Sequence, residues 1–412
     1  MAKEINQVLR GTAAFNLVGK AVVNQYTFKM DAESQKSDWV YNQMQLKVKT
    51  NEGDIQAEMM GGYGSARKNQ VYVHGTKVND NGKTVDDFKN SFVIDWEDRF
   101  DEEILEKVGE RCFINVGIEK DENGKVVYKK FLSEYDAIQY IESGLKDGDV
   151  VNVKGDLSYQ MYNGNLSVKK NIRSIVLSNK EEKDFKATFT QTILTDNSSL
   201  GKPDKETRTL PIDCYIVDFS KEFDGKKIIR MVNGKKKEGL NIPMPKTFDF
   251  RIGEDLEKAK KMVKYFKAKN KKVSEITVDG IFTKGGNLET VQVTIDDVPE
   301  DIKELIELGM IDETEVLEKI AFANGGNKKP EQMIILRPHV DMVANGDQKT
   351  PSLAVVSDKY NEDDLMIENV LEVNGARFED EEQPELDLED DSPFGTEDDS
   401  DDDIDWGDWS DM

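Results

Sequence analysis

The amino-acid sequence predicts a mainly β (α+β) protein, in which two small closed β-barrel domains with inserted helices precede a disordered acidic tail. Three observations support this fold class. Seven Asn-Gly pairs, which tight hairpin turns prefer, are distributed along the chain. Several of them are flanked by alternating apolar and polar residues, the pattern of half-buried strands. Acidic residues are concentrated at the C-terminus, where they leave too little apolar surface for a packed core.

The charge distribution divides the chain into a nearly neutral body and an acidic C-terminal segment. The 412 residues carry 56 Lys and Arg against 82 Asp and Glu, a formal net charge of −26. Residues 361–412 hold 23 acids and one base, Arg377, so residues 1–360 hold 59 acids and 55 bases, a net charge of −4. A body of about 360 residues indicates about two domains. We expect a first domain over 1–182, a second over 183–345, a linker over 346–378 and the tail over 379–412.

The composition excludes several classes of protein. No apolar stretch approaches the roughly 20 residues of a membrane helix, and the N-terminus lacks the apolar segment of a signal peptide, so we expect a cytoplasmic protein. Two cysteines, Cys112 and Cys214, cannot form a disulfide framework or a cysteine-rich zinc site. The two histidines, His74 and His339, lie near no nucleophile elbow and no second metal ligand. We therefore expect no catalytic site, no metal and no cofactor.

The stretch from Val150 to Leu177 is the clearest pair of predicted strands, because apolar residues alternate on both sides of its Asn-Gly pair. A similar arrangement recurs about 125 residues later. Val151–Leu157 and a following Gly-Asn-Leu sequence match Ile276–Phe282 and another Gly-Asn-Leu sequence. The glycine inside each strand indicates a bulge or bend of the kind that coils the strands of small barrels. The match predicts an internal duplication.

Three helical stretches interrupt the predicted strands: Asp101–Val108, Glu254–Ala268, and Pro299–Phe322, which Gly309 breaks into two helices. Apolar residues of the second stretch share one face. The polar segment Glu181–Asp184 is a suitable link between the two domains.

A closed five-stranded barrel with curved strands and long loops is the oligonucleotide/oligosaccharide-binding (OB) fold, and single-stranded nucleic acid is the ligand we expect here. Such a site needs cations along a groove for the phosphates and aromatic faces for the bases, with stacking worth about 1–3 kcal/mol per base. The first domain contains this mixture of side chains. The candidate residues are Tyr26, Trp39, Tyr41, Tyr63, Arg67, Lys68, Lys154, Tyr159, Tyr162, Lys169, Lys170 and Arg173.

The alternative for these aromatic residues is that they fill the barrel or pair across strands. We expect Tyr63, Tyr159 and Tyr162 to lie outside the core, because turns and glycine-rich loops place side chains there. The second domain adds two basic clusters. The cluster Lys226–Lys237 contributes Lys235, Lys236 and Lys237 as phosphate contacts, whereas the lysines of Lys258–Lys272 are better explained as the solvated face of a helix.

The tail carries the most specific signal. Asp403–Met412 interleaves large apolar residues with aspartates and holds two of the chain's four tryptophans. This terminus, together with Asp390–Phe394, resembles the acidic tails of bacterial and phage single-stranded DNA-binding proteins, the phage versions having aromatic tips. The resemblance implies a disordered tail whose apolar-acidic tip docks on replication, recombination or repair proteins. The partner-binding residues that it implies are Phe394, Ile404, Asp405, Trp406, Asp408 and Trp409.

The sequence therefore predicts a phage-type protein that binds and coats single-stranded DNA without strong sequence preference during replication, recombination or repair. Its tail would recruit partner proteins and compete for the DNA groove. The alternative is an acidic DNA mimic or interaction protein that occupies the basic surface of a nucleic-acid enzyme, although a mimic does not need aromatic residues mixed with lysines in turns. An enzymatic role, as a nuclease or ligase accessory, has no supporting motif, and the oligomeric state stays open.

Overall fold

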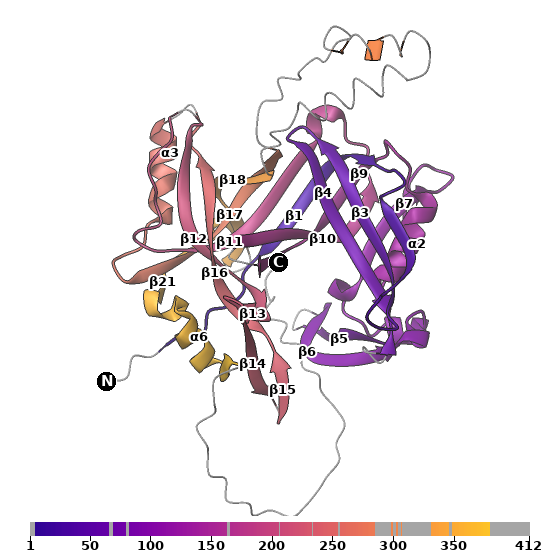
Figure 1. The fold of residues 1–412 in the computed structure, drawn as a ribbon, viewed down its shortest axis with the longest axis horizontal. Helices are drawn as coiled ribbons and strands as arrows, with labels where there is room; N and C mark the ends of the chain where they lie inside the picture. The colour runs from indigo at the N-terminus through magenta and orange to yellow at the C-terminus, as the bar shows by residue number, and fades with distance from the viewer. Residues whose placement is uncertain are drawn as a thin grey trace, which may run out of the picture.

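The computed structural model shows a chain built mostly from β-strands, which form one large twisted sheet and several small ribbons (Figure 1). The structure describes residues 5–65, 69–79, 82–162, 165–205, 207–232, 234–253, 256–284, 331–345 and 348–379, with positions 298, 299, 302, 303 and 306. The predicted tail lies outside these residues from position 380 onward, and so do Arg67, Lys68 and most of the predicted helical stretch Pro299–Phe322.

Five strands of the N-terminal half form a closed series of backbone pairings, which we name circuit 1. β1 pairs with β3 and β9, β3 pairs with β4, β4 pairs in parallel with β10, and β10 pairs with β9. The helix α2 precedes β9 in the chain and contacts β3 and β4. The bounds are β1 Ala13–Val22, β3 Val40–Thr50, β4 Gly53–Tyr63, α2 Glu134–Gly144, β9 Val150–Tyr162 and β10 Asn165–Leu177.

A second closed series, circuit 2, repeats the same order of strands. β11 pairs with β12 and β17, β12 pairs with β16, β16 pairs in parallel with β18, and β18 pairs with β17. A helix, α3, again precedes the fourth strand. The bounds are β11 Lys186–Thr195, β12 Thr209–Ser220, β16 Leu240–Arg251, α3 Leu256–Val263, β17 Lys272–Lys284 and β18 Glu331–Pro338.

The two circuits also agree in the position of one aromatic residue and one glycine. Phe15 of β1 lies opposite Gly155 of β9, and Phe189 of β11 lies opposite Gly280 of β17. A Cβ atom at Gly155 would lie 1.9 Å from a backbone oxygen of β10, and one at Gly280 would lie 2.2 Å from the Phe189 ring. Glycine is therefore required at both positions, as expected of a bend where the next strand or ring approaches closely. The predicted duplication places its two segments in these equivalent fourth strands.

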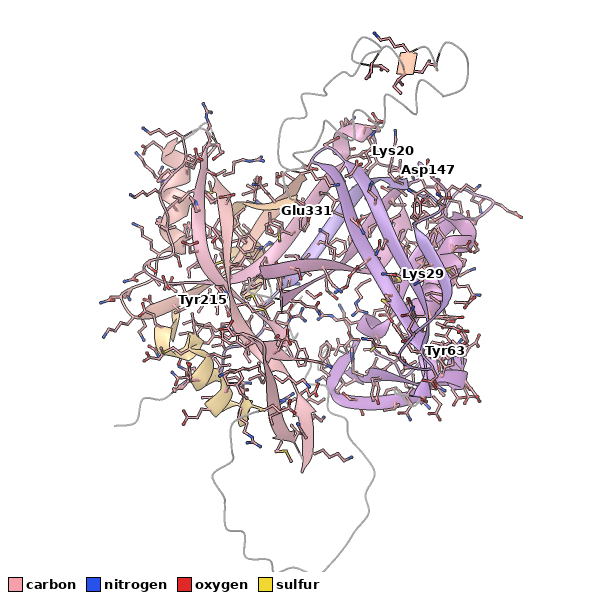
Figure 2. All side chains as sticks on the ribbon, in the orientation of Figure 1. Lys20, Lys29, Tyr63, Asp147, Tyr215 and Glu331 are labelled. Atoms are coloured by element: carbon pink, nitrogen blue, oxygen red, sulfur yellow. The ribbon has the colours of Figure 1, made fainter. Side chains whose placement is uncertain are left out.

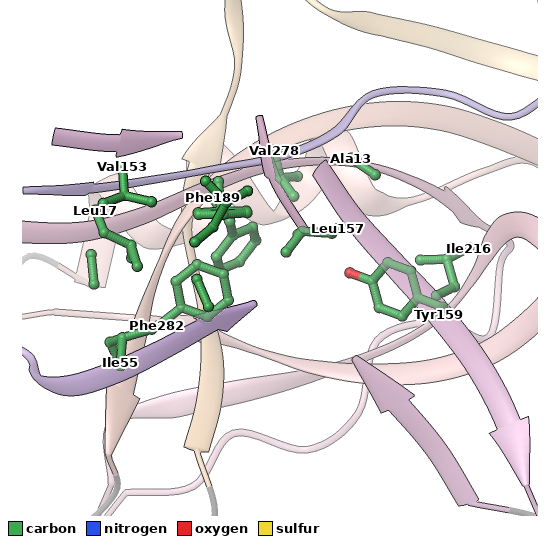
Figure 3. Packing of buried hydrophobic residues seen from close by; sticks show 14 of the residues in the cluster. Ala13, Leu17, Ile55, Val153, Leu157, Tyr159, Phe189, Ile216, Val278 and Phe282 are labelled. Carbon is green, nitrogen blue, oxygen red and sulfur yellow. The ribbon is translucent and has the colours of Figure 1, made fainter. Parts of the chain in front are cut away.

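The circuits share one hydrophobic core, because residues 13–18 of β1 pair with residues 186–191 of β11 and bring the interiors together. Leu17, Val153 and Leu157 from circuit 1 lie in the same cluster as Phe189 and Phe282 from circuit 2 (Figure 3). The ring centroids of Phe189 and Phe282 are 5.3 Å apart. Burying this apolar surface in common stabilises the two circuits as one body.

Insertions extend both circuits. Circuit 1 carries β2 Phe28–Glu33 before β3, and, between β4 and α2, β5 Gln70–Val78, β6 Thr84–Asp95, η2 Trp96–Asp98, α1 Glu102–Leu105, η3 Glu110–Cys112, β7 Ile114–Lys120 and β8 Val126–Phe131. The connection between the circuits holds η4 Glu182–Asp184. Circuit 2 carries β13 Glu222–Phe223, β14 Lys226–Val232 and β15 Lys235–Glu238 between β12 and β16, and η5 Lys264–Phe266 after α3.

The predicted linker over 346–378 is wrong, because the chain there is folded. Its elements are β20 Gln348–Leu353, which pairs with β19 Val340–Asn345, then β21 Val355–Asn361, η7 Glu362–Leu365, α6 Ile367–Val373 and β22 Ala376–Phe378. β21 pairs with β17 and β22 pairs with β14, while Tyr360, Val370 and Leu371 are buried. The segment was predicted to be a linker because acidic residues are frequent in it, but a few apolar residues between them pack against distant strands. The predicted helix Asp101–Val108 is also shorter than expected, since α1 spans four residues.

Candidate nucleic-acid interface

The outer side of β3 and β4 presents a strip of polar, basic and aromatic side chains. Met44, Leu46 and Val48 of β3 point into the core, so the alternate residues point outward. The same alternation holds on β4, where Ile55, Ala57 and Met59 are buried. We name this surface the β3–β4 face. It comprises Tyr41, Gln43, Gln45, Lys47 and Lys49 of β3 with Gln56, Glu58 and Met60 of β4.

Lysines occupy one end of the β3–β4 face. Lys47 and Lys49 are exposed, and within the part of the chain that the structure describes neither forms an ion pair. Lys20 of β1 lies directly across from Lys49, and its ammonium is 2.5 Å from a carboxylate oxygen of Glu182. Figure 2 labels Lys20 at this end of the strands, Lys29 near their middle and Tyr63 at the far end. The exposed ammonium groups can contact phosphates with little loss of existing interactions.

Aromatic side chains occupy the other end of the face, where β3 begins. The rings of Trp39 and Tyr41 stack, with centroids 4.6 Å apart and planes 17° apart. Lys29 of β2 donates a hydrogen bond of 2.9 Å to the Tyr41 hydroxyl. Tyr26, in the turn before β2, is 80% exposed. Among the predicted aromatic residues, these three are therefore accessible or half-accessible to a base, as a stacking platform requires.

Tyr63 lies at the same end of the strands but on the opposite side of β4, and its ring is packed against other rings. Its centroid is 5.3 Å from that of Trp96 and 5.5 Å from that of Tyr135. Trp96 and Tyr135 were not predicted to join Tyr63, because they belong to η2 and α2 and are distant from it in the chain. Burial, followed by the hydrogen bond that its hydroxyl donates to Asp31, raises the pKa of Tyr135.

Arg99 fixes this aromatic cluster to α2. Its guanidinium lies 4.1 Å from the centre of the Trp96 ring and donates hydrogen bonds of 2.7 and 3.1 Å to the two carboxylate oxygens of Asp136. A bidentate pair of this kind defines both distance and orientation. The β5–β6 insertion is thereby held against the end of circuit 1.

The structure overturns the prediction that Tyr159 lies outside the core. Its side chain is 1% exposed, and its hydroxyl donates a hydrogen bond of 2.9 Å to the buried amide oxygen of Gln191. Burial raises the pKa of Tyr159 well above its usual range. The cause is that β9 continues past circuit 1 and packs on circuit 2, where the Tyr159 backbone amide donates to Asp218 over 2.7 Å. The side chain of Tyr162 lies outside the described residues.

Lys170 is likewise a contact between the circuits and cannot reach a phosphate as predicted. Its side chain is buried, with the ammonium 2.5 Å from a Glu331 oxygen of β18 and 4.8 Å from the centre of the Phe282 ring. A buried charge requires such partners, since leaving it unpaired is costly. Lys170 therefore joins the two circuits.

The remaining predicted cations of circuit 1 are exposed but dispersed. Lys169 lies 3.6 Å from Glu58, so it borders the β3–β4 face. Arg173 forms ion pairs with Glu134 at 3.2 Å and Asp156 at 3.1 Å, which hold it beside α2. Lys154 lies on β9, which pairs with β1 and β10 and touches neither strand of the face.

Comparison with known proteins adds a family assignment. A profile of the YorF family matches residues 41–294, more than half of the chain. The chain belongs to the YorF family. Among solved structures, this YorF-family protein is similar to a deletion mutant of the single-stranded DNA binding protein from Thermus aquaticus, with 11% identity and a TM-score of 0.26 over 67% of this chain and 88% of that one. No curated protein sequence matches it.

The basic clusters of circuit 2 lie apart from the β3–β4 face. Lys235 and Lys236 are exposed on β15, and Lys237 is half-buried. The helix α3 buries Ala259 and leaves its lysines exposed, which fits the solvated-helix alternative. In this YorF-family protein the lysines of β14–β15 and those of α3 therefore lie on separate surfaces, and β14 and β15 project from the body of the protein (Figure 1).

One cluster of the YorF-family protein combines a thiol, an imidazole and a carboxylate. The Cys112 sulfur lies 3.2 Å from Nδ1 of His74, whose Nε2 lies 3.6 Å from Asp86. Burial raises the pKa of Cys112 to about 11, so the thiol stays protonated at neutral pH.

Within the described ranges no three side chains form a metal-binding group, and no helix is long and apolar enough to cross a membrane.

Proposed function

We propose that this YorF-family protein binds single-stranded nucleic acid, and DNA in particular, on the β3–β4 face without strong sequence preference. The observation that carries the proposal is the sequence of side chains along β3. Within nine residues, the outward positions run from a half-exposed aromatic stack at Tyr41 through two glutamines to Lys47 and Lys49. Aromatic faces serve bases and lysines serve phosphates, so one strand offers both parts of a nonspecific site.

The order of the strands supports an OB-type barrel for each circuit. Both circuits contain five strands, pair the third strand in parallel with the fifth, and insert a helix before the fourth. In OB folds, oligonucleotides bind on strands 2 and 3 and on the neighbouring loops. In circuit 1 these strands are β3 and β4. The segment between β1 and β3, which includes β2, supplies Tyr26, Lys29 and Trp39, which extend the same site.

A titration of the double variant Lys47→Ala, Lys49→Ala tests the proposed site. Fluorescently labelled oligo-dT and a duplex of equal length are titrated at two salt concentrations. Loss of two phosphate contacts should weaken binding to oligo-dT at low salt and reduce the slope of log affinity against log salt by about 1.4. Lys154→Ala is the matched control, because Lys154 is exposed on β9 away from the face. Equal slopes for the double variant and the control would contradict the site.

The acidic tail has two roles in the proposal. It recruits replication, recombination or repair proteins through its apolar-acidic end, and it competes with nucleic acid for the basic surface. Its supports are the 17 acidic residues of 380–412 and the absence of any Lys or Arg there. A tethered segment acts at roughly millimolar effective concentration, which suits such competition.

We propose a binding protein and not an enzyme. Cleavage of a labelled oligonucleotide in the presence of Mg²⁺ or Mn²⁺ would contradict this. The acidic DNA mimic remains the alternative function. It predicts no affinity for oligo-dT, and instead a stable complex with a basic nucleic-acid enzyme.

A further inference from the structure

A basic β-ribbon projects from circuit 2 (Figure 1). We name β14 and β15 together the β14–β15 ribbon. Its cations are Lys226, Lys227, Arg230, Lys235, Lys236 and Lys237. The other edge of β14 pairs with β22, which brings Phe378 opposite Ile228. The ribbon thus concentrates positive charge on a surface that a second segment of the chain reaches.

Glu379, the residue that follows β22, forms ion pairs with the ribbon. Its carboxylate oxygens lie 2.6 Å from the ammonium of Lys236 and 3.7 Å from that of Lys227. Its backbone amide donates a hydrogen bond of 2.9 Å to the Lys227 carbonyl, which fixes the residue in place. The hydrogen bond from Lys236, with the charge of both lysines, lowers the pKa of Glu379. One carboxylate is therefore held ionised between two ammonium groups.

The face of the ribbon that holds Lys227 and Lys236 also has an apolar part. Met231, directly across from Lys236, is 54% exposed and offers an apolar contact beside the charges. Exposed ion pairs contribute little stability, about 0–1 kcal/mol each, so a multivalent anion can replace the carboxylate.

We infer that Lys227 and Lys236 form a phosphate site for nucleic acid, and that Glu379 occupies this site in cis until nucleic acid displaces it. A phosphodiester presents two anionic oxygens, as the carboxylate does, and both need the same two ammonium groups. Binding of one therefore excludes the other. The inference rests on the proposed function for the identity of the anion. It adds a second contact surface, on circuit 2, to the β3–β4 face of circuit 1.

The test compares Glu379→Gln with Glu372→Gln in the full-length chain. Both variants remove one negative charge, but Glu372 is exposed on α6 and forms no ion pair with the described residues. Glu379→Gln should tighten binding of oligo-dT about threefold to tenfold at low salt, because two lysines are released. The salt slope should steepen by about 0.7 for each lysine that gains a phosphate. Glu372→Gln should match the unmodified chain.

Two further arms make the outcome decisive. In the Lys236→Ala background, Glu379→Gln should give a smaller gain, since only Lys227 remains to be released. Inorganic polyphosphate, titrated in parallel, separates this inference from the proposed function. If oligo-dT does not bind but Glu379→Gln binds polyphosphate more tightly than Glu372→Gln, the anion site stands and the proposed function fails. If Glu379→Gln and Glu372→Gln bind both anions equally, the inference is overturned.

Discussion

Substitution of Tyr159 distinguishes a core residue from a base-stacking residue. The sequence places this tyrosine close to a hairpin turn and suggests contact with nucleic acid, whereas the structure buries it between the circuits. Tyr159→Ala removes a fully buried aromatic ring, which costs about 3–5 kcal/mol. It also leaves the buried Gln191 oxygen without its donor, a further cost of about 1–3 kcal/mol. Tyr159→Phe keeps the ring and should cost only the second amount.

These costs are large against a total stability of about 5–15 kcal/mol for a typical protein. Urea unfolding followed by circular dichroism should therefore show a lower midpoint for Tyr159→Phe and a much lower one for Tyr159→Ala. Oligo-dT affinity of the folded Tyr159→Phe protein should be unchanged, because the hydroxyl faces Gln191 and not solvent.

Tyr41→Ala is the matched control for this experiment, since Tyr41 stacks with Trp39 on the β3–β4 face. It should give the opposite result. Loss of one stacking partner, worth about 1–3 kcal/mol, weakens oligo-dT binding about 5-fold to about 150-fold, with little change in the unfolding midpoint. The reasoning is refuted if Tyr159→Phe weakens DNA binding and leaves the unfolding midpoint unchanged.

Three other predictions concern contacts in the structure, and a fourth concerns the acidic tail. Lys170→Ala leaves the partly exposed Glu331 without its partner between the circuits and should lower stability by about 1–3 kcal/mol in urea unfolding; an unchanged midpoint would contradict the role of the pair. Gly155→Ala places a Cβ atom 1.9 Å from a backbone oxygen and should cost at least about 3 kcal/mol or prevent soluble expression. Because the pKa of Cys112 is raised to about 11, its alkylation by iodoacetamide at pH 8 should be about two orders of magnitude slower than that of an unperturbed thiol. That rate should rise about tenfold per pH unit up to pH 10, and a plateau below pH 9 would indicate a thiolate paired with an imidazolium. Deleting residues 380–412, which spares Glu379, should tighten oligo-dT binding at low salt more than at high salt; equal affinities at every salt concentration would exclude competition by the tail.

Local patterns in the sequence indicated several of the hairpins. Five of the seven Asn-Gly pairs lie between strands that pair with each other, namely β5–β6, β7–β8, β9–β10, β14–β15 and β19–β20. Turn preferences and alternation act over a few residues, so a single sequence displays them directly. The glycine shared by the two fourth strands could also be recognised, because a glycine inside a strand usually marks a bulge or the close approach of another strand.

The site was predicted only in part, because exposure depends on what packs against each strand. For Trp39 and Tyr41 the sequence left a core position open beside a role in the site, and the structure has both half-buried on the β3–β4 side of the sheet; Lys47 and Lys49 follow on the same strand but were not among the predicted site residues. Alternation from the buried Met44, Leu46 and Val48 was the signal that could have identified them. The predictions that Tyr159 and Lys170 contact nucleic acid were wrong because circuit 2 covers the end of the β9–β10 hairpin and buries both side chains.

The sequence by itself determined the type of protein: a β-rich body with a repeated strand motif, and a chain whose negative charge is collected at one end. Those properties depend on composition and on neighbouring residues. Three features required the folded chain: the strands that close each circuit, the core that the circuits share through β1 and β11, and the contact of Glu379 with Lys236 across 143 positions of sequence. Such contacts join residues far apart in the chain, and the sequence pattern around one partner does not indicate which residue the other partner is.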